Sequence, residues 1–249
     1  MKRRHFLLFG AATFSSSLFA APSSMPHACQ AWYLPPSLAG SKNNLTLNVR
    51  DTDSALGRYN PNGCIKTVTL DELVKFHGHL CDGIVFTFLQ LCVALKKLFP
   101  DGVIDRTDIR GACKNSPCMV DGLSYMSGAR INFQTLRIDA SLGASHIVQK
   151  ISTWETYQVQ LAKEMSSPAL KNAEDAIRAK VAANQTVTPA EIDHVEKLAD
   201  DFITMMLSTP LENLIQIQKL EGYQFVPNSS VDAFGKRSDV VNKKVGRSS

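Results

Sequence analysis

The sequence predicts an α+β fold in which a small mixed or antiparallel sheet surrounds a buried central helix, followed by C-terminal helices. Residues 84–99 are apolar on nearly every side, which is typical of a helix enclosed by the core. Long helical patterns dominate after residue 155. Shorter segments alternate between apolar and polar residues and are candidate strands, at 45–49, 103–110, 130–139 and 145–152.

Length and composition indicate a globular protein with one large or two small domains. The chain has 249 residues, of which 44% are apolar and 20% are charged, enough to build a real core. Its formal charge is +4, but Lys2, Arg3 and Arg4 supply three of these charges, which leaves about +1 for the remainder. Because no basic stripe remains, we expect no binding to nucleic acid.

Residues 1–28 have the features of an export signal. The charged run Lys2-Arg3-Arg4 precedes a short apolar stretch from Phe6 to Ala21. An arginine pair followed by Phe6-Leu7 resembles a twin-arginine signal, and an ordinary secretory signal is the alternative. The stretch is too short and serine-rich for a spanning helix. We therefore expect a periplasmic protein with no membrane span after the signal is removed.

The rest of the chain divides into four expected regions. Residues 29–64 are rich in prolines, glycines and asparagines and are expected to be extended chain and loops. Residues 65–155 form the predicted α+β core, and residues 156–226 form the predicted helical region. Residues 227–249 are polar, so we expect a disordered tail.

Helix signals define the core. Thr69 is a predicted N-cap for a helix that ends near His77-Gly78. The central helix over 84–99 ends at Pro100, and Ser116-Pro117 starts another helix that runs to about residue 127. We expect a hairpin around residues 141–143. The C-terminal helices are expected at 155–165, 169–183, 190–208 and 211–220, the third opened by a capping box from Thr188 to Glu191.

His77, His79 and Cys81 alternate along a short segment. In a continuous helix His79 would point away from the other two residues. Gly78 favours an irregular segment instead, in which all three side chains project the same way. Asp82 is a natural N-cap for the central helix, which places Cys81 at a helix N-terminus where its thiol pKa is lowered. Thiolate and imidazole together suit zinc or another transition metal.

Cys118 occupies an analogous position on a second helix. It lies two residues past the expected cap Ser116, and Asp121 shares its helical face. We expect these two helix N-termini to meet across one cavity. Cys81 and Asp121 are the candidate catalytic residues of such a site.

Several alternatives for the cysteines and histidines remain open. In an oxidising compartment Cys29 could pair with Cys64, and Cys113 could pair with Cys118, which would remove a metal ligand. His77, His79 and Cys81 could also be packed core residues. Cys92 lies in the apolar central helix and is expected to be inert core, while His146 is a weak ligand candidate.

Two sequence blocks resemble a known family. The run Phe76-His77-Gly78-His79-Leu80-Cys81 followed by Gly83 resembles the F-H-G-H-x-C-P-G signature of the FmdE family, whose name comes from formylmethanofuran dehydrogenase. The run from Cys118 to Leu123, followed by Gly128, is similar to the second block of that family. The resemblance covers about residues 65–155. It implies an α+β core, a homodimer and a metal-binding cleft that contains His77, His79, Cys81 and Cys118, with Asp121 beside them.

The chain departs from the family pattern in several places. The proline of the signature is Asp82 here, the alanine of the second block is Gly122, and a cysteine-threonine pair is replaced by Ala129-Arg130. The usual glycine- and lysine-rich run does not follow. No cysteine follows Cys118, so we do not expect the cysteine-rich zinc domain of many relatives. These departures weaken any transfer of substrate contacts or of the family's name-giving activity.

Three functions are compatible with these residues. The first is a periplasmic metal-binding protein, catalytic if three ligands leave an open position and structural or a metal carrier if four close it. The second is an accessory module that binds a metal, haem or molybdopterin-type cofactor for a periplasmic oxidoreductase. The third is a thiol-redox protein that uses Cys81 with Cys118 or Cys113, although no C-x-x-C motif is present.

Overall fold

The computed structural model describes residues 41, 43, 45–51 and 65–228. The predicted export signal, Cys29, Cys64 and almost all of the expected C-terminal tail lie outside these residues. Export, the periplasmic location and the pairing of Cys29 with Cys64 therefore stay predictions of the sequence.

The strands form two sheets. A three-stranded sheet has the order β2-β1-β3, with β1 antiparallel to β2 and parallel to β3. A five-stranded sheet has the order β5-β4-β6-β7-β8, antiparallel except between β4 and β5. The strands are β1 Thr46–Arg50, β2 Lys66–Thr69, β3 Val103–Asp105, β4 Ile109–Cys113, β5 Leu136–Ile138, β6 His146–Lys150, β7 Thr156–Leu161 and β8 Ile215–Lys219.

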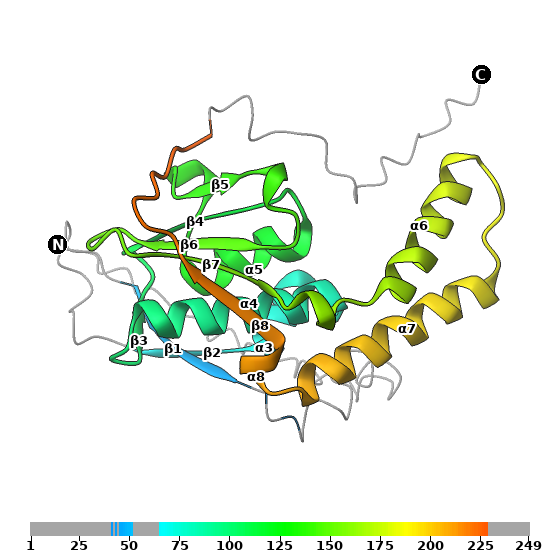
Figure 1. The fold of residues 1–249 in the computed structure, drawn as a ribbon, viewed down its shortest axis with the longest axis horizontal. Helices are drawn as coiled ribbons and strands as arrows, with labels where there is room; N and C mark the ends of the chain where they lie inside the picture. The colour runs from blue at the N-terminus through cyan, green and yellow to red at the C-terminus, as the bar shows by residue number, and fades with distance from the viewer. Residues whose placement is uncertain (1–40, 42, 44, 52–64, 229–249) are drawn as a thin grey trace, which may run out of the picture.

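The helices lie beside these sheets and confirm the predicted α+β class (Figure 1). Helices α4 and α5 pack close to the five-stranded sheet, whereas α6 and α7 form a hairpin that extends away from it. The α-helices are α3 Leu70–His77, α4 Asp82–Leu98, α5 Pro117–Ser127, α6 Pro168–Ala182, α7 Pro189–Ser208 and α8 Leu211–Leu214. Short 3₁₀ turns occur at η1 Ile131–Phe133, η2 Ala140–Leu142 and η3 Lys163–Met165.

Helix α4 is the centre of the core, as its apolar sequence predicted. It contacts both sheets and also α3, α5 and α7. Cys92 in its middle is 0% exposed, which confirms the expected core role. None of the helices in the described part of the chain is long and apolar enough to cross a membrane.

The predicted helix ends agree closely with the structure. Thr69 caps α3 in a capping box with Glu72, and Thr188 does the same for α7. Helix α5 starts at Pro117 after Ser116 and ends at Gly128, whose φ of 76° is left-handed. These ends depend on local side-chain and backbone preferences, which explains why the sequence reveals them.

Two of the expected strands are wrong in extent or pairing. The segment 103–110 contains β3 and the start of β4, which belong to different sheets. The segment 130–139 forms η1 and only the three-residue β5. The hairpin expected around residues 141–143 is absent from the described structure because β4 lies between β5 and β6. Parallel pairing of β5 with β4 replaces it.

Two of the expected C-terminal helices are also wrong. Residues 155–165 contain strand β7, which pairs with β6, and residues 211–220 form one helical turn followed by β8. The boundary expected after residue 155 therefore falls inside the five-stranded sheet. Pairing with β6 decides this outcome, because an edge that needs strand partners overrides local helix preference.

The described chain ends against the opposite edge of that sheet. After β8 it returns across the sheet towards β5 (Figure 1). There the Asn228 side chain accepts a hydrogen bond from the Ile138 amide and donates one to the Ile138 carbonyl. Asn228, expected within a disordered tail, instead occupies the backbone groups of an edge strand.

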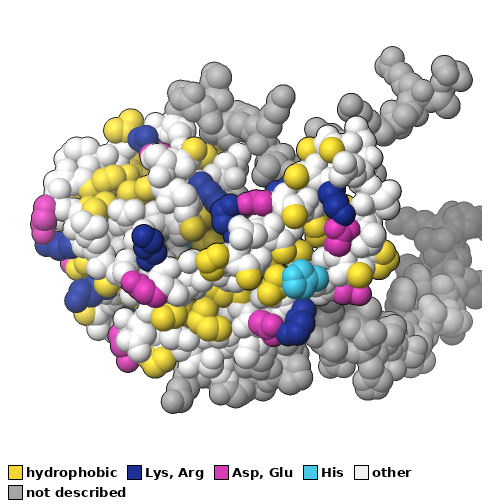
Figure 2. Space-filling view, turned by 45° about the vertical axis from the view of Figure 1, so that its right-hand side comes forward, with side chains coloured by type: hydrophobic (Ala, Val, Ile, Leu, Met, Phe, Trp, Pro, Cys, Tyr) yellow, Lys and Arg dark blue, Asp and Glu magenta, His cyan; other side chains and the backbone are white. Residues whose placement is uncertain are grey.

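The hairpin of α6 and α7 keeps apolar surface that the described residues leave uncovered. Val181 and Ile192 are among its exposed side chains. Figure 2 shows hydrophobic side chains on this side of the molecule, interrupted by charged ones. Both helices nevertheless form as predicted from their periodicity and caps.

His146 and Gln90 form a polar pair inside the core. Both side chains are 0% exposed. Gln90 donates its amide N–H to the Ala144 carbonyl, so its amide oxygen accepts from His146 Nδ1 at 2.7 Å. Burial lowers the pKa of His146 to about 3, so the imidazole is neutral in the folded protein. His146, a weak ligand candidate by sequence, is thus engaged with α4.

This pair predicts acid destabilisation. Below pH 6.5 the unfolded chain protonates His146 while the folded protein does not until about pH 3. Stability from this residue is therefore present above pH 6.5 and falls by about 1.4 kcal/mol per pH unit as the pH drops through that window. Urea unfolding of wild type and His146→Gln at pH 7 and pH 5 measures it. We expect the variant to lose less stability than wild type, and the exposed His194→Gln to behave like wild type.

Candidate metal centre

The centre of the site is the corner between α3 and α4. Helix α3 ends at His77, and Gly78 takes a left-handed conformation with φ of 101°. Cys81 itself is the N-cap of α4, with its Sγ accepting from the Ile84 amide at 3.4 Å. The expected cap, Asp82, is instead the first helical residue. A sulfur acceptor fills the capping position, so the prediction was wrong by one residue.

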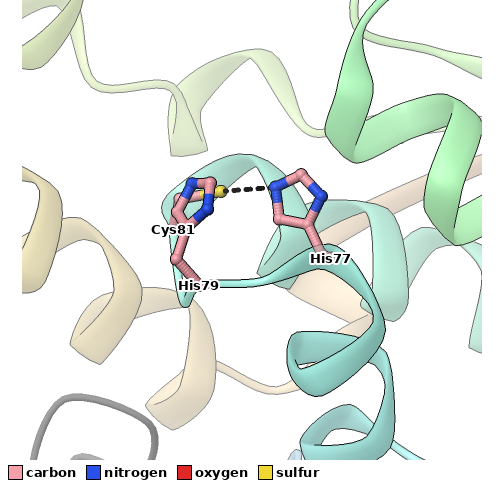
Figure 3. A group of neighbouring side chains, drawn as sticks. All are labelled: His77, His79 and Cys81. Atoms are coloured by element: carbon pink, nitrogen blue, oxygen red, sulfur yellow. Dashed lines mark hydrogen bonds between the residues drawn. The ribbon is translucent and has the colours of Figure 1, made fainter. Parts of the chain in front are cut away.

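His77, His79 and Cys81 point towards one another across this corner (Figure 3). One potential ligand atom from each lies within 4.8 Å of the others. Cys81 Sγ is 3.8 Å from His77 Nε2, and the two imidazole ring centroids are 4.6 Å apart. The irregular segment that Gly78 predicted therefore brings the three alternating side chains together.

Cys118 joins the corner from the N-terminus of α5. Its Sγ is 3.5 Å from Cys81 Sγ and 3.6 Å from His77 Nε2. The two cysteine-bearing helix N-termini thus meet, as expected. Cys113 is a free thiol buried in β4, and Cys118 is also free. The alternative disulfide between Cys113 and Cys118 is therefore wrong.

Asp121 lies behind the imidazole of His77. Its Oδ2 accepts a hydrogen bond from His77 Nδ1 at 2.8 Å, and the His77 side chain is only 3% exposed. This contact turns Nε2 towards Cys81 and Cys118. Asp121, a candidate catalytic residue by sequence, is placed here as the group that orients an imidazole.

Gly83 allows the two cysteines to approach. A Cβ at this position would lie 2.7 Å from Cys118 Sγ and 3.1 Å from Cys118 Cβ. Only a residue without a side chain leaves space for Cys118 at this point of α4. The sequence motif contained this glycine, but its role depends on a helix 35 positions further along the chain.

An aromatic contact beside the site was missed from the sequence. Phe76 stacks on Tyr125 with ring centroids 5.1 Å apart. Phe76 immediately precedes His77, and Tyr125 follows Asp121 by one helical turn. The stack therefore joins α3 to α5 next to the hydrogen bond between His77 and Asp121. Its spacing on α5 was visible, but its partner on α3 was not.

The charges of the site are strongly coupled. The hydrogen bond to Asp121, followed by that to Cys118, raises the pKa of His77 to about 9. The hydrogen bond from Cys81, together with His77, lowers the pKa of Cys118 to about 5. At neutral pH without a metal, these values describe an imidazolium beside a thiolate.

The other two ligand candidates titrate in the opposite directions. Donating to the Cys118 thiolate, followed by burial, raises the pKa of Cys81, so this group is a thiol. Desolvation and the neighbouring charge of His77 lower the pKa of His79, which leaves its imidazole neutral at pH 7. Neutral imidazole is the form that ligates metals.

Three donor atoms have the spacing of a tetrahedral metal site. With bonds of about 2.3 Å to sulfur and about 2.0–2.1 Å to nitrogen, neighbouring ligand atoms are about 3.5–3.8 Å apart. Cys81 Sγ, Cys118 Sγ and His77 Nε2 are separated by 3.5, 3.6 and 3.8 Å. The donor set and its spacing therefore fit a zinc-like ion, with His79 beside this triangle.

Replacing Gly83 with alanine tests the close approach of the sulfurs. The new methyl group should displace Cys118, so Gly83→Ala should lower the free energy of unfolding by about 1–3 kcal/mol, despite alanine's higher helix propensity. Chemical denaturation measures the loss. In a Cys118→Ala background the clash is relieved, so the same change should cost less. An equal cost in both backgrounds would contradict this role of Gly83.

The comparisons with known proteins address this same part of the chain. The family model described as "FmdE, Molybdenum formylmethanofuran dehydrogenase operon" matches residues 76–216. No curated protein is similar enough to count as a match. A crystal structure of a tungsten formylmethanofuran dehydrogenase FmdE-like protein from Syntrophus aciditrophicus is 15% identical, covers 69% of this chain and 79% of its own, and has a TM-score of 0.37. Since the family match spans more than half of the sequence, this chain belongs to the FmdE family.

Proposed function

We propose that this protein binds a zinc-like transition metal through His77, Cys81 and Cys118. The spacing of their three donor atoms, 3.5–3.8 Å, is the observation that carries the proposal. Asp121 would hold His77 in the required orientation, as carboxylates commonly do behind metal-bound imidazoles. Family membership supports a shared site, because the family match includes all four residues.

His79 decides what such a metal would do. Its ligand atom is within 4.8 Å of those of His77 and Cys81, and the residue is exposed. If His79 is a fourth ligand, the site is closed and serves a structural or carrier role. If it stays unligated, a metal ion would supply Lewis acidity at a position open to solvent. His79 would then be the neutral base nearest to that position.

A non-catalytic accessory role is the second candidate. Four cavities of about 280–470 Å³ occur in the described structure, and all four are lined by residues other than the three proposed ligands. This favours a protein that handles a metal or metal-containing cofactor for another enzyme. The family description, which names the operon of a molybdenum enzyme, supports the same alternative. The homodimer and a periplasmic oxidoreductase partner stay predictions.

Metal analysis of native protein tests the main proposal. Wild type purified from its natural compartment without added metal should contain about one equivalent of zinc or a similar ion. Cys81→Ser and Cys118→Ser should each lose most of it, since each removes a thiolate ligand. Elemental analysis by mass spectrometry provides the measurement.

Cys92→Ser is the matched control, because Cys92 is buried in α4 away from the cluster. Its metal content should equal that of wild type in whatever fraction folds. Negligible metal in wild type and both ligand variants would refute the proposal. A His79→Ala variant that retains full metal would favour three protein ligands.

Removing the Asp121 carboxylate should weaken the site without removing a ligand. Asp121→Asn should reduce zinc affinity by about 10–100-fold, because Nε2 of His77 becomes less basic and less well oriented. Competition with a chromophoric chelator measures the affinity. Ser124→Ala, on the same helix, should leave it unchanged. Unaltered affinity in Asp121→Asn would exclude the orienting role.

A further inference from the structure

We propose that Cys81 and Cys118 form a reversible disulfide in the metal-free protein, so that oxidation of this pair and metal binding exclude one another. The inference rests on the proposed function in that it names a regulation of the same site. Its chemical probe is a low-molecular-weight disulfide, a class of oxidant that exchanges directly with thiolates.

The separation of the sulfurs carries the inference. Cys81 Sγ and Cys118 Sγ are 3.5 Å apart, on residues 37 positions apart in the chain. A disulfide requires about 2.05 Å, so closure needs the sulfurs to approach by about 1.5 Å. Gly83 contributes no side chain to the space beside them. Neither helix has to unfold for such a shift.

The surroundings distinguish the two sulfurs. Cys118 is in the first turn of α5, directly after Pro117, and His77 Nε2 lies 3.6 Å from its Sγ. A helix N-terminus and an imidazolium both stabilise thiolate. Cys81 Sγ instead caps α4 by accepting from the Ile84 amide. Cys118 is therefore the attacking sulfur and Cys81 the resolving one.

The exchange is balanced in two steps. The Cys118 thiolate attacks one sulfur of an external disulfide RSSR, which forms a mixed disulfide and releases RS⁻. Cys81 then loses its proton to the released thiolate or to His77 and attacks the Cys118 sulfur, which expels the second RS⁻. Two protein thiols are oxidised to one disulfide, and RSSR is reduced to two RSH once protons equilibrate.

The same two sulfurs are the proposed metal ligands, which creates the exclusion. A sulfur bonded to another sulfur has no thiolate charge to offer a metal. Conversely, a metal held between the two sulfurs occupies the electron pairs that would attack RSSR. The other described thiols, Cys92 and Cys113, are each 0% exposed. Among the described cysteines, only the pair at the site is partly accessible.

The experiment uses the full chain with Cys29→Ser and Cys64→Ser, reduced and stripped of metal. After incubation with oxidised glutathione, peptide mass spectrometry should find Cys81 linked to Cys118. Adding Cys81→Ser should trap one glutathione on Cys118. Adding Cys118→Ser should leave Cys81 unmodified over the same time. Zinc-loaded protein should react about tenfold more slowly than metal-free protein. Cys92→Ser should match the parent.

Several results would overturn the inference. Absence of the Cys81–Cys118 linkage in protein that binds zinc would remove it while the metal site stands. Equal reaction of Cys81 when Cys118 is replaced would reverse the assigned roles. Equal rates in zinc-loaded and metal-free protein would refute the exclusion. A linkage in protein that binds no metal would instead overturn the proposed function and leave the disulfide established.

Discussion

The close packing of α5 on α4 is the constraint on which the site depends. Two glycines permit it: a Cβ at Gly122 would lie 2.2 Å from Thr87 Cγ2, and one at Gly83 would lie 2.7 Å from Cys118 Sγ. Helices packed this closely bring their N-termini together along with the cysteine that each carries. Two positive helix ends then face one small volume, which favours anionic sulfur there. The core of the protein and the chemistry of its site thus rest on the same helix pair.

Helix α3 completes this arrangement by supplying an imidazole of fixed orientation. Its capping box and left-handed Gly78 set where the helix ends, so His77 is its last residue. The hydrogen bond from His77 to Asp121 then ties α3 to α5, and the stack of Phe76 on Tyr125 reinforces the same junction. A ligand held from behind by a carboxylate loses little orientational freedom when it binds, which is the physical basis of preorganisation.

The sequence predicted those features that depend on neighbours along the chain. The ends of α3, α5 and α7, the buried α4 and the meeting of Cys81 with Cys118 all follow from caps, glycines and apolar pattern. Strands β7 and β8 were mistaken for helices because partners distant in sequence select their conformation. The alternation in Ile215–Lys219 was a strand signal that the helix assignment overlooked. Asp121 was placed on the correct face, but its hydrogen bond depends on how α3 packs against α5.

The site is preorganised for a cation because protons already occupy the space between its donors. In the metal-free protein, the N–H at His77 Nε2 and the thiol proton of Cys81 both point towards the Cys118 sulfur. These hydrogen bonds hold three donor atoms at the separations that a tetrahedral ion requires. A metal that displaces both protons would find its ligands in place, so its binding should release protons but demand little movement. The same geometry explains why the two sulfurs are close enough to react with each other.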